Sequence, residues 1–148
     1  MKDTDLAQPS DYPFVDAFNS RFARVYYLEE PKIVIGEMKA EYVPIEHFKT
    51  TFHQIGELVK AGYNSKLIFD KRALRAFHQP SMEWYYVVWK RDMLEHGLRV
   101  HRKLLPDEAW FQKSVMIAKD QIHRRYPDNV IDQLDIQYCN TLEAAITT

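Results

Sequence analysis

The clearest hydrophobic pattern in the chain begins after Pro44 and has the spacing of an amphipathic helix. Apolar residues recur at steps of three and four, which places them on one helix face: Ile45, Phe48, Phe52, Ile55 and Val59. Proline is favourable in the first turn of a helix, and Gly62, after the last apolar position, is suited to a left-handed C-terminal cap. The pattern therefore predicts a helix between Pro44 and Gly62.

Shorter apolar segments on either side of this helix predict strands. Residues 22–28 are dense in aromatic and branched side chains, and the same composition resumes over 33–41 after a turn that contains Glu-Glu-Pro-Lys. These two segments predict a β-hairpin. Beyond the helix, the short apolar run 66–70 is typical of a buried strand.

A second helix is predicted over 82–96, after a polar loop that covers 71–80. Pro80 and Ser81 are typical of a helix start, where the Ser81 hydroxyl can cap the first turn. Gly97 is typical of a helix end.

The C-terminal third continues the alternation of strand and helix. Residues 98–105 predict a strand, and Pro106 opens a helix that Pro127 ends. The apolar face of that helix has four members: Phe111, Val115, Ala118 and Ile122. A last strand over 135–139 leads into a short terminal helix, for which Asn140 is the expected N-cap.

The predicted order of elements is β-β-α-β-α-β-α-β-α. Strands that alternate with helices favour a parallel sheet covered by helices, with only the first hairpin strand antiparallel. Residues 1–20 are rich in Asp, Pro, Ser and Gln, and we interpret them as a flexible N-terminal arm. The prediction is one α/β domain over 21–148 with about four helices.

Composition narrows the classes of function. A length of 148 residues fits one domain, and 20 basic against 21 acidic residues leave no net field that would attract nucleic acid. The longest apolar run, 84–89, is far shorter than the roughly 20 residues of a membrane-spanning helix. No secretory signal pattern is present, and the single Cys139 fits a reducing compartment. We therefore expect a cytoplasmic protein without membrane insertion.

Motifs for catalysis are missing. His47 and His53 share a predicted helix but point about 120° apart, so they cannot ligate one metal ion. The four glycines form no phosphate-binding pattern, and Cys139 has no neighbouring cation or histidine in sequence to activate its thiol. We therefore expect no catalytic residue, no metal and no cofactor, and we expect that the protein is not an enzyme.

A basic cluster follows the strand at 66–70. It has six candidate residues for binding an anion or a partner: Asp70, Lys71, Arg72, Arg75, His78 and Ser81. The loop comes after a predicted parallel strand, at the edge where open α/β sheets gather ligands. The alternative is a solvated loop whose charges keep the protein soluble.

The second helix has more apolar surface than one sheet face can cover. Four aromatic residues are candidates for an interface or a ligand surface: Trp84, Tyr85, Tyr86 and Trp89. Four alternatives explain the pattern. The extra apolar surface is covered by core packing on both sides of the helix, by the N-terminal arm, by a second subunit or by an apolar ligand. Trp84 and Trp89 point about 140° apart on an ideal α-helix, so we expect one in the core and one at a homodimer interface.

The pattern as a whole resembles SpoIIAA-like proteins of the STAS superfamily, which share a grouping with the SEC14-type lipid-transfer fold. Four features carry the resemblance over 21–148: the opening hairpin, the strand Leu-Ile-Phe-Asp that ends at Asp70, the helix at 81–96, and the ending Tyr-Cys-Asn-Thr-Leu-Glu-Ala-Ala-Ile over 138–146. Regulatory members carry a phosphorylatable serine in an Asp-Ser-Ser-Gly-like stretch. The corresponding Gln-Pro-Ser-Met here lacks the second serine and the glycine, so we predict that Ser81 is a cap and not a phosphosite.

The resemblance implies a non-catalytic regulatory module of bacterial type. Its regulatory members dock protein partners through the same loop and helix, which implies a protein-binding, partner-switching role. The SEC14 relationship implies an alternative from a different class, a carrier of a lipid-like apolar small molecule.

Overall fold

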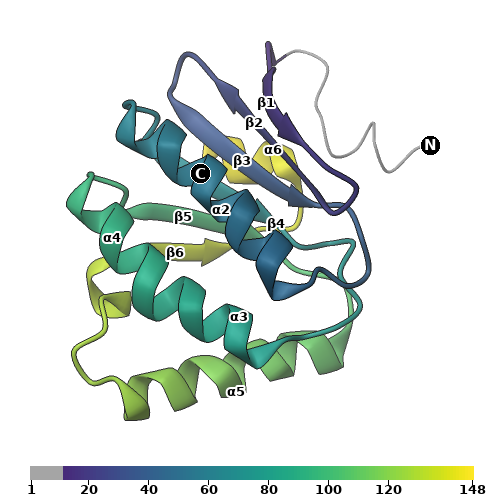
Figure 1. The fold of residues 1–148 in the computed structure, drawn as a ribbon, viewed down its shortest axis with the longest axis vertical. Helices are drawn as coiled ribbons and strands as arrows, with labels where there is room; N and C mark the ends of the chain where they lie inside the picture. Colours follow the sequence, from purple (N-terminus) through teal and green to yellow (C-terminus); the bar gives the residue numbers. More distant parts are fainter. Residues whose placement is uncertain (1–11) are drawn as a thin grey trace.

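A six-stranded sheet runs through residues 12–148, the part of the chain that the computed structural model describes (Figure 1). The order of strands in the sheet is the order in sequence: β1 (Val15–Asn19), β2 (Ala23–Leu28), β3 (Ile33–Met38), β4 (Lys66–Asp70), β5 (Val100–Leu104) and β6 (Asp135–Tyr138). β2 is antiparallel to both of its neighbours, and β3 to β6 are parallel. The predicted mostly parallel α/β sheet is confirmed.

Helices cover both faces of the sheet. The helical elements are α2 (Ile45–Lys60), α3 (Gln79–Trp84), the π turn η1 (Tyr85–Trp89), α4 (Lys90–Glu95), α5 (Ala109–Arg125), the 3₁₀ turn η2 (Ile131–Gln133) and α6 (Leu142–Thr147). α3, η1 and α4 follow one another without a break and form one long helix. This helix lies with α2 and α5 on one face of the sheet, and α6 lies on the other (Figure 1).

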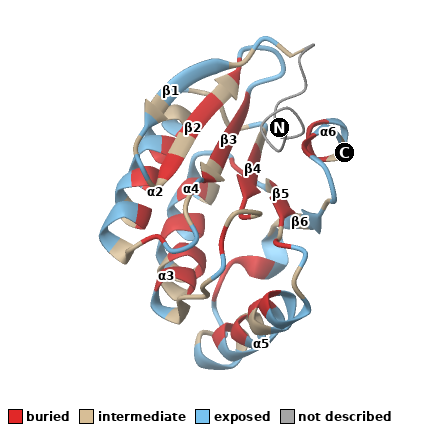
Figure 2. Ribbon diagram, turned by 90° about the vertical axis from the view of Figure 1, so that its right-hand side faces the viewer, coloured by how far each residue is buried: buried red, intermediate tan, exposed pale blue. Residues whose placement is uncertain are grey.

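The larger core lies between the sheet and α2, α3–α4 and α5. The predicted apolar faces are buried there, including Phe52 and Ile55 of α2 and Phe111 and Val115 of α5. A smaller core packs α6 against the opposite face. Figure 2 shows that the central strands are buried while the outer side of α5 is exposed.

β1 was not expected from the sequence. It pairs with β2 from Val15↔Tyr27 to Asn19↔Arg24, so the predicted arm contributes a strand to the sheet. Most of its side chains are exposed, because it is an edge strand, and its sequence therefore lacks a clear apolar alternation. The remainder of the predicted arm, 1–11, lies outside the described residues.

Two predicted helix starts are displaced. α3 begins at Gln79, and its N-cap is His78, whose Nδ1 accepts a hydrogen bond from the Ser81 amide. Ser81 is therefore inside the first turn and only 5% exposed, so its prediction as N-cap is wrong. At α6 the cap is Thr141 in place of Asn140, because the Thr141 hydroxyl accepts from the amide three residues on.

The π turn changes which side chains share a helix face. A π turn takes more residues per turn than an α turn, so the 140° expected between Trp84 and Trp89 does not apply. Both rings face α2: Trp84 lies 6.1 Å from Phe48, and Trp89 lies 4.9 Å from Phe52, between ring centroids. Trp89 is 3% exposed and lies in the core, as expected of one of the two tryptophans, whereas Trp84 is half-buried against α2 and its role at an interface stays a prediction.

Gly97, which ends the long helix, has a backbone φ of +92°. A Cβ added there would lie 2.8 Å from Nδ2 of Asn64, which donates to the His96 carbonyl. We expect Gly97→Ala to lower the free energy of unfolding by about 1–2 kcal/mol in urea titrations, from left-handed strain and this contact. Gly62→Ala is the control, because Gly62 has φ +113° with open space around it. Equal losses in both variants would show that the Asn64 contact costs nothing.

Candidate functional site

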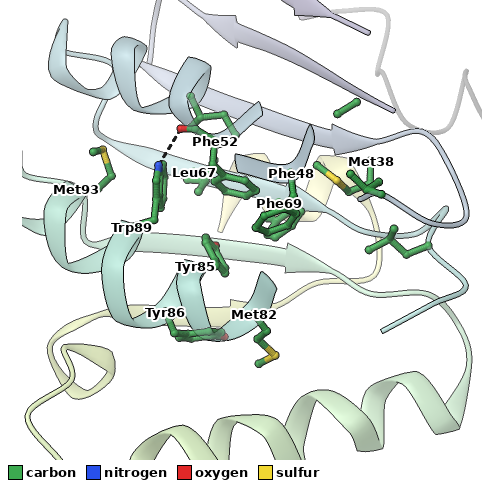
Figure 3. Packing of buried hydrophobic residues seen from close by; sticks show 14 of the residues in the cluster. Met38, Phe48, Phe52, Leu67, Phe69, Met82, Tyr85, Tyr86, Trp89 and Met93 are labelled. Atoms are coloured by element: carbon green, nitrogen blue, oxygen red, sulfur yellow. Dashed lines mark hydrogen bonds between the residues drawn. The ribbon is translucent and has the colours of Figure 1, made fainter. Parts of the chain in front are cut away.

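A cavity of about 50 Å³ lies where β3 and β4 end, and it is partly open to solvent. The last residue of β3, Met38, and the aromatic ring of Phe69 in β4 form part of its wall. Phe48 from α2 and Tyr85 from the long helix also line it (Figure 3). The carboxyl ends of parallel strands commonly carry the binding site in α/β proteins, and this cavity occupies that position.

Lys71 supplies the cationic group of the cavity wall. It directly follows β4, its side chain is 6% exposed, and its Nζ lies 5.0 Å from the centroid of the Phe69 ring. None of the residues that line the cavity is acidic, and no ion pair joins Lys71 to a carboxylate in the described part of the chain. Burial, followed by the charge of Lys119, lowers the pKa of Lys71 to about 7.

Asp70, the residue before Lys71, faces away from the cavity. Successive residues of an extended strand point to opposite faces, so Asp70 and Lys71 diverge. Asp70 accepts two hydrogen bonds from the Arg72 guanidinium, at 2.9 and 2.8 Å, and lies in the field of Glu37. Burial and the nearby Asp70 raise the pKa of Glu37. The acidic groups of this edge therefore leave Lys71 without a counter-ion.

Two more polar side chains of the cavity wall come from the start of α3. Ser81 Oγ and His78 Nδ1 are 2.8 Å apart, and both residues line the cavity. The hydroxyl of Tyr85 is buried without a hydrogen-bond partner in the described residues. The wall is thus apolar, with one amine, one imidazole and a few hydroxyls.

Behind the cavity lies a set of buried bases, which we call the buried basic cluster: Lys71, Lys90, His101 and Lys103. Lys90 and Lys103 are both 0% exposed, and their Nζ atoms lie 3.9 and 4.3 Å from the centroid of the Tyr86 ring. Lys103 donates to the Tyr86 hydroxyl, whereas Lys90 Nζ has no acceptor in hydrogen-bonding geometry within the described residues.

Burial is the main cause that lowers the pKa of each member of this cluster. For Lys103 and His101 the charge of Lys90 is the next cause, while for Lys90 the neighbouring Lys103 partly offsets the effect of burial. Within residues 12–148, no acidic side chain is among the causes of these shifts. The low pKa values of Lys71, Lys90 and Lys103 therefore favour the neutral form of these amines in the interior between the sheet and the helices.

This arrangement predicts a pH dependence of stability. In the unfolded chain Lys71 stays protonated up to about pH 10.5, whereas in the folded protein its pKa is about 7. Between these values the unfolded state binds more protons, so stability rises with pH by about 1.4 kcal/mol per unit for one such amine. We expect urea unfolding between about pH 7 and 9 to show this rise, and Lys71→Met to reduce the slope by up to one proton. An unchanged slope in the variant would show that the Lys71 amine is charged in the folded protein.

The structure divides the six candidate residues of the loop. Lys71, His78 and Ser81 line the cavity, Asp70 and Arg72 pair with each other on the opposite side of the sheet edge, and the exposed Arg75 donates to the backbone carbonyls of Arg72 and Leu74. The loop therefore does not gather its basic side chains around one anion.

The four aromatic candidates fit one of the expected alternatives, packing within the chain on both sides of the long helix. Tyr85, Tyr86 and Trp89 are buried within the chain, and Trp84 is half-buried against α2. Only Tyr85 reaches the cavity wall. The dense aromatic composition is explained by the position of the long helix, which contacts α2 on one side and α5 on the other.

Sequence reasoning missed the buried bases behind the cavity. A signal was present in β5, where His101, Arg102 and Lys103 are consecutive in a strand between two parallel neighbours. A central parallel strand is covered on both faces, so three basic residues in succession must include buried ones. Lys90 gave no such signal, because a lysine in a helix is normally solvated.

Comparisons of the chain with protein-family models, with curated proteins and with solved structures found no match. None of the helices within residues 12–148 has the length and apolar character needed to cross a membrane. In the same residues, no three His, Cys, Asp or Glu side chains are grouped so that they could hold a metal ion. The resemblance to SpoIIAA-like proteins stays a prediction from the sequence.

Proposed function

We propose that the protein binds a small, mainly apolar molecule with one oxygen-bearing head group, and that the cavity beside Lys71 is the binding site. The observation that carries the proposal is Lys71, a residue only 6% exposed that lines an apolar wall with no acidic side chain. Holding an amine in apolar surroundings is costly for folding, and a ligand oxygen would offer it an acceptor.

The surroundings of the amine define the ligand further. Phe48, Phe69, Leu74 and Met82 offer apolar contact, whereas a strongly hydrated polyanion would find only one cationic side chain on the wall. A cavity of about 50 Å³ accepts a small group, so a longer tail would extend through the open side. Short aromatic and aliphatic carboxylates fit this description and serve as probes.

Thermal unfolding in the presence of benzoate or hexanoate tests the proposal. At about 10 mM probe, a Kd near 0.1 mM would stabilise the folded protein by ~2.7 kcal/mol. A carboxylate favours the charged amine, so we expect tighter binding as the pH falls through the pKa of Lys71, about 7. Benzyl alcohol, which has no charge, should bind without this pH dependence.

Three variants locate the site. Lys71→Met removes the amine, and Ala76→Phe fills the cavity at a lining position, so both should abolish the stabilisation by benzoate. Lys113→Met replaces an exposed lysine of α5 and should leave the stabilisation unchanged. Absence of any benzoate or hexanoate effect on the wild-type protein, or an equal effect in all three variants, would refute the proposal.

The regulatory, partner-switching role and the homodimer stay predictions from the sequence. Light scattering at micromolar protein concentration measures the homodimer directly. Three of the four aromatic candidates, Tyr85, Tyr86 and Trp89, are buried within the chain, and we therefore favour the small-molecule carrier.

A further inference from the structure

We infer that Lys71 is a nucleophilic amine that captures aldehydes in this cavity as reversible imines. The inference rests on the proposed function, since it assigns the head group of the ligand: a carbonyl carbon that the amine can attack. It requires an amine that is accessible from the cavity, that is not tied to an acid, and that lies near groups able to transfer protons.

The first two requirements are met by the position of Lys71. It lines a cavity that is partly open, and the neighbouring acid is held on the other side of the sheet edge by Arg72. A carboxylate beside the amine would keep it protonated and without a free electron pair, whereas the charged group that acts on Lys71 within the described residues is another cation, Lys119 of α5. A like charge favours the neutral form of the amine.

The reaction is a condensation that needs no oxidant, reductant or metal. The nitrogen lone pair of Lys71 attacks the carbonyl carbon, a C–N bond forms, and one N–H proton passes to the carbonyl oxygen to give a carbinolamine. A proton donated to the hydroxyl lets it depart as water, and loss of the second N–H proton from nitrogen leaves the C=N bond. Atoms balance as amine plus aldehyde giving imine plus water.

Groups for these proton transfers are present on the same wall. The His78 imidazole, hydrogen-bonded to Ser81, can deliver a proton to the departing hydroxyl, and the Tyr85 hydroxyl is buried without another partner. The apolar side chains around them limit the access of water that would hydrolyse the imine. These residues would position and protonate the ligand, while the new bond forms only at Lys71.

Reductive trapping tests the inference. The full chain is incubated at pH 7 with benzaldehyde and cyanoborohydride, which converts an imine into a stable secondary amine, and intact mass and peptide mapping locate the benzyl group. An amine of pKa about 7 is half neutral at this pH, whereas an ordinary lysine is neutral in roughly one molecule in 2,500. Among the lysines, we expect the benzyl group on Lys71, at a rate at least roughly tenfold that of any exposed lysine.

Matched variants separate this inference from the proposed function. Lys71→Arg keeps a cation that binds benzoate but offers no nucleophile, so it should retain stabilisation by benzoate and lose the adduct. Lys71→Met should lose both, and Lys113→Met should lose neither. Benzoate should slow the trapping at Lys71 in the wild-type protein, and Ala76→Phe should prevent it.

The outcomes are distinguishable. If benzoate stabilises the protein but benzyl groups are spread over exposed lysines, the imine inference is wrong and the proposed function stands. If Lys71 is trapped equally with benzoate present and in Ala76→Phe, the amine is reactive outside the cavity and the inference is also wrong. If neither benzoate binding nor an adduct is found, both are wrong.

Discussion

Trp89→Ala should lower the free energy of unfolding by about 3–5 kcal/mol, the largest loss expected from a single substitution. Its indole is 3% exposed, packs against Phe52 and Tyr85, and donates from Nε1 to the Phe52 carbonyl at 2.8 Å (Figure 3). The substitution leaves a cavity in the centre of the larger core. Urea unfolding followed by circular dichroism measures the loss, because the method does not depend on tryptophan fluorescence.

Trp84→Ala is the matched control in the same helix. Trp84 is half-buried, so its loss should be smaller, roughly 1–2 kcal/mol. Neither substitution should change the mass found by light scattering, since both rings pack against α2. A Trp84→Ala protein that is fully stable but changes from dimer to monomer would restore the interface predicted from the sequence.

Lys90→Met should have the opposite effect and raise the free energy of unfolding by about 1–3 kcal/mol at pH 7. The Lys90 amine is fully buried, lacks an acceptor among the described residues, and lies beside the amine of Lys103. Methionine has a similar unbranched shape and no polar hydrogen to satisfy. The benefit should shrink as the pH rises toward about 10.5, because the unfolded lysine then also becomes neutral.

Lys113→Met is the control for this prediction, since an exposed lysine of α5 should contribute within about 0.5 kcal/mol. Both variants are compared with wild type in urea at two or more pH values. A destabilised Lys90→Met protein would show that a counter-ion or an acceptor compensates the buried amine. That result would argue that the buried basic cluster itself binds a ligand.

Most of the fold was predictable because its elements have strong local signals. The face of α2 and the face of α5 follow the helical period, and Gly62 and Gly97 have the positive φ that a C-terminal cap needs. β1 was not predictable in the same way, because an exposed edge strand buries few side chains and is stabilised by backbone pairing that composition does not reveal. The π turn at Tyr85–Trp89 has no proline, glycine or other local mark in the sequence.

The site was predictable only in part. The loop after β4 follows the carboxyl end of a parallel strand, as the sequence predicts, but which side chains point inward depends on how the strand ends. The alternation that separates Asp70 from Lys71 follows from the strand, yet the burial of Lys71 requires α2 and α3 to close over it. Lys90 is buried although Arg91 and Asp92 beside it in the same helix are exposed, and a lysine at such a position gives no signal of burial in the sequence.

The order of strands has a consequence for how this chain folds. Because each strand pairs with its neighbour in sequence, no strand has to wait for a distant segment before it can join the sheet. Synthesis proceeds at about 5–20 residues per second, so the hairpin of β2 and β3 can form before β4 has left the ribosome. Each later helix and strand then adds one unit to an existing edge, and the sheet is able to grow from its N-terminal side during translation.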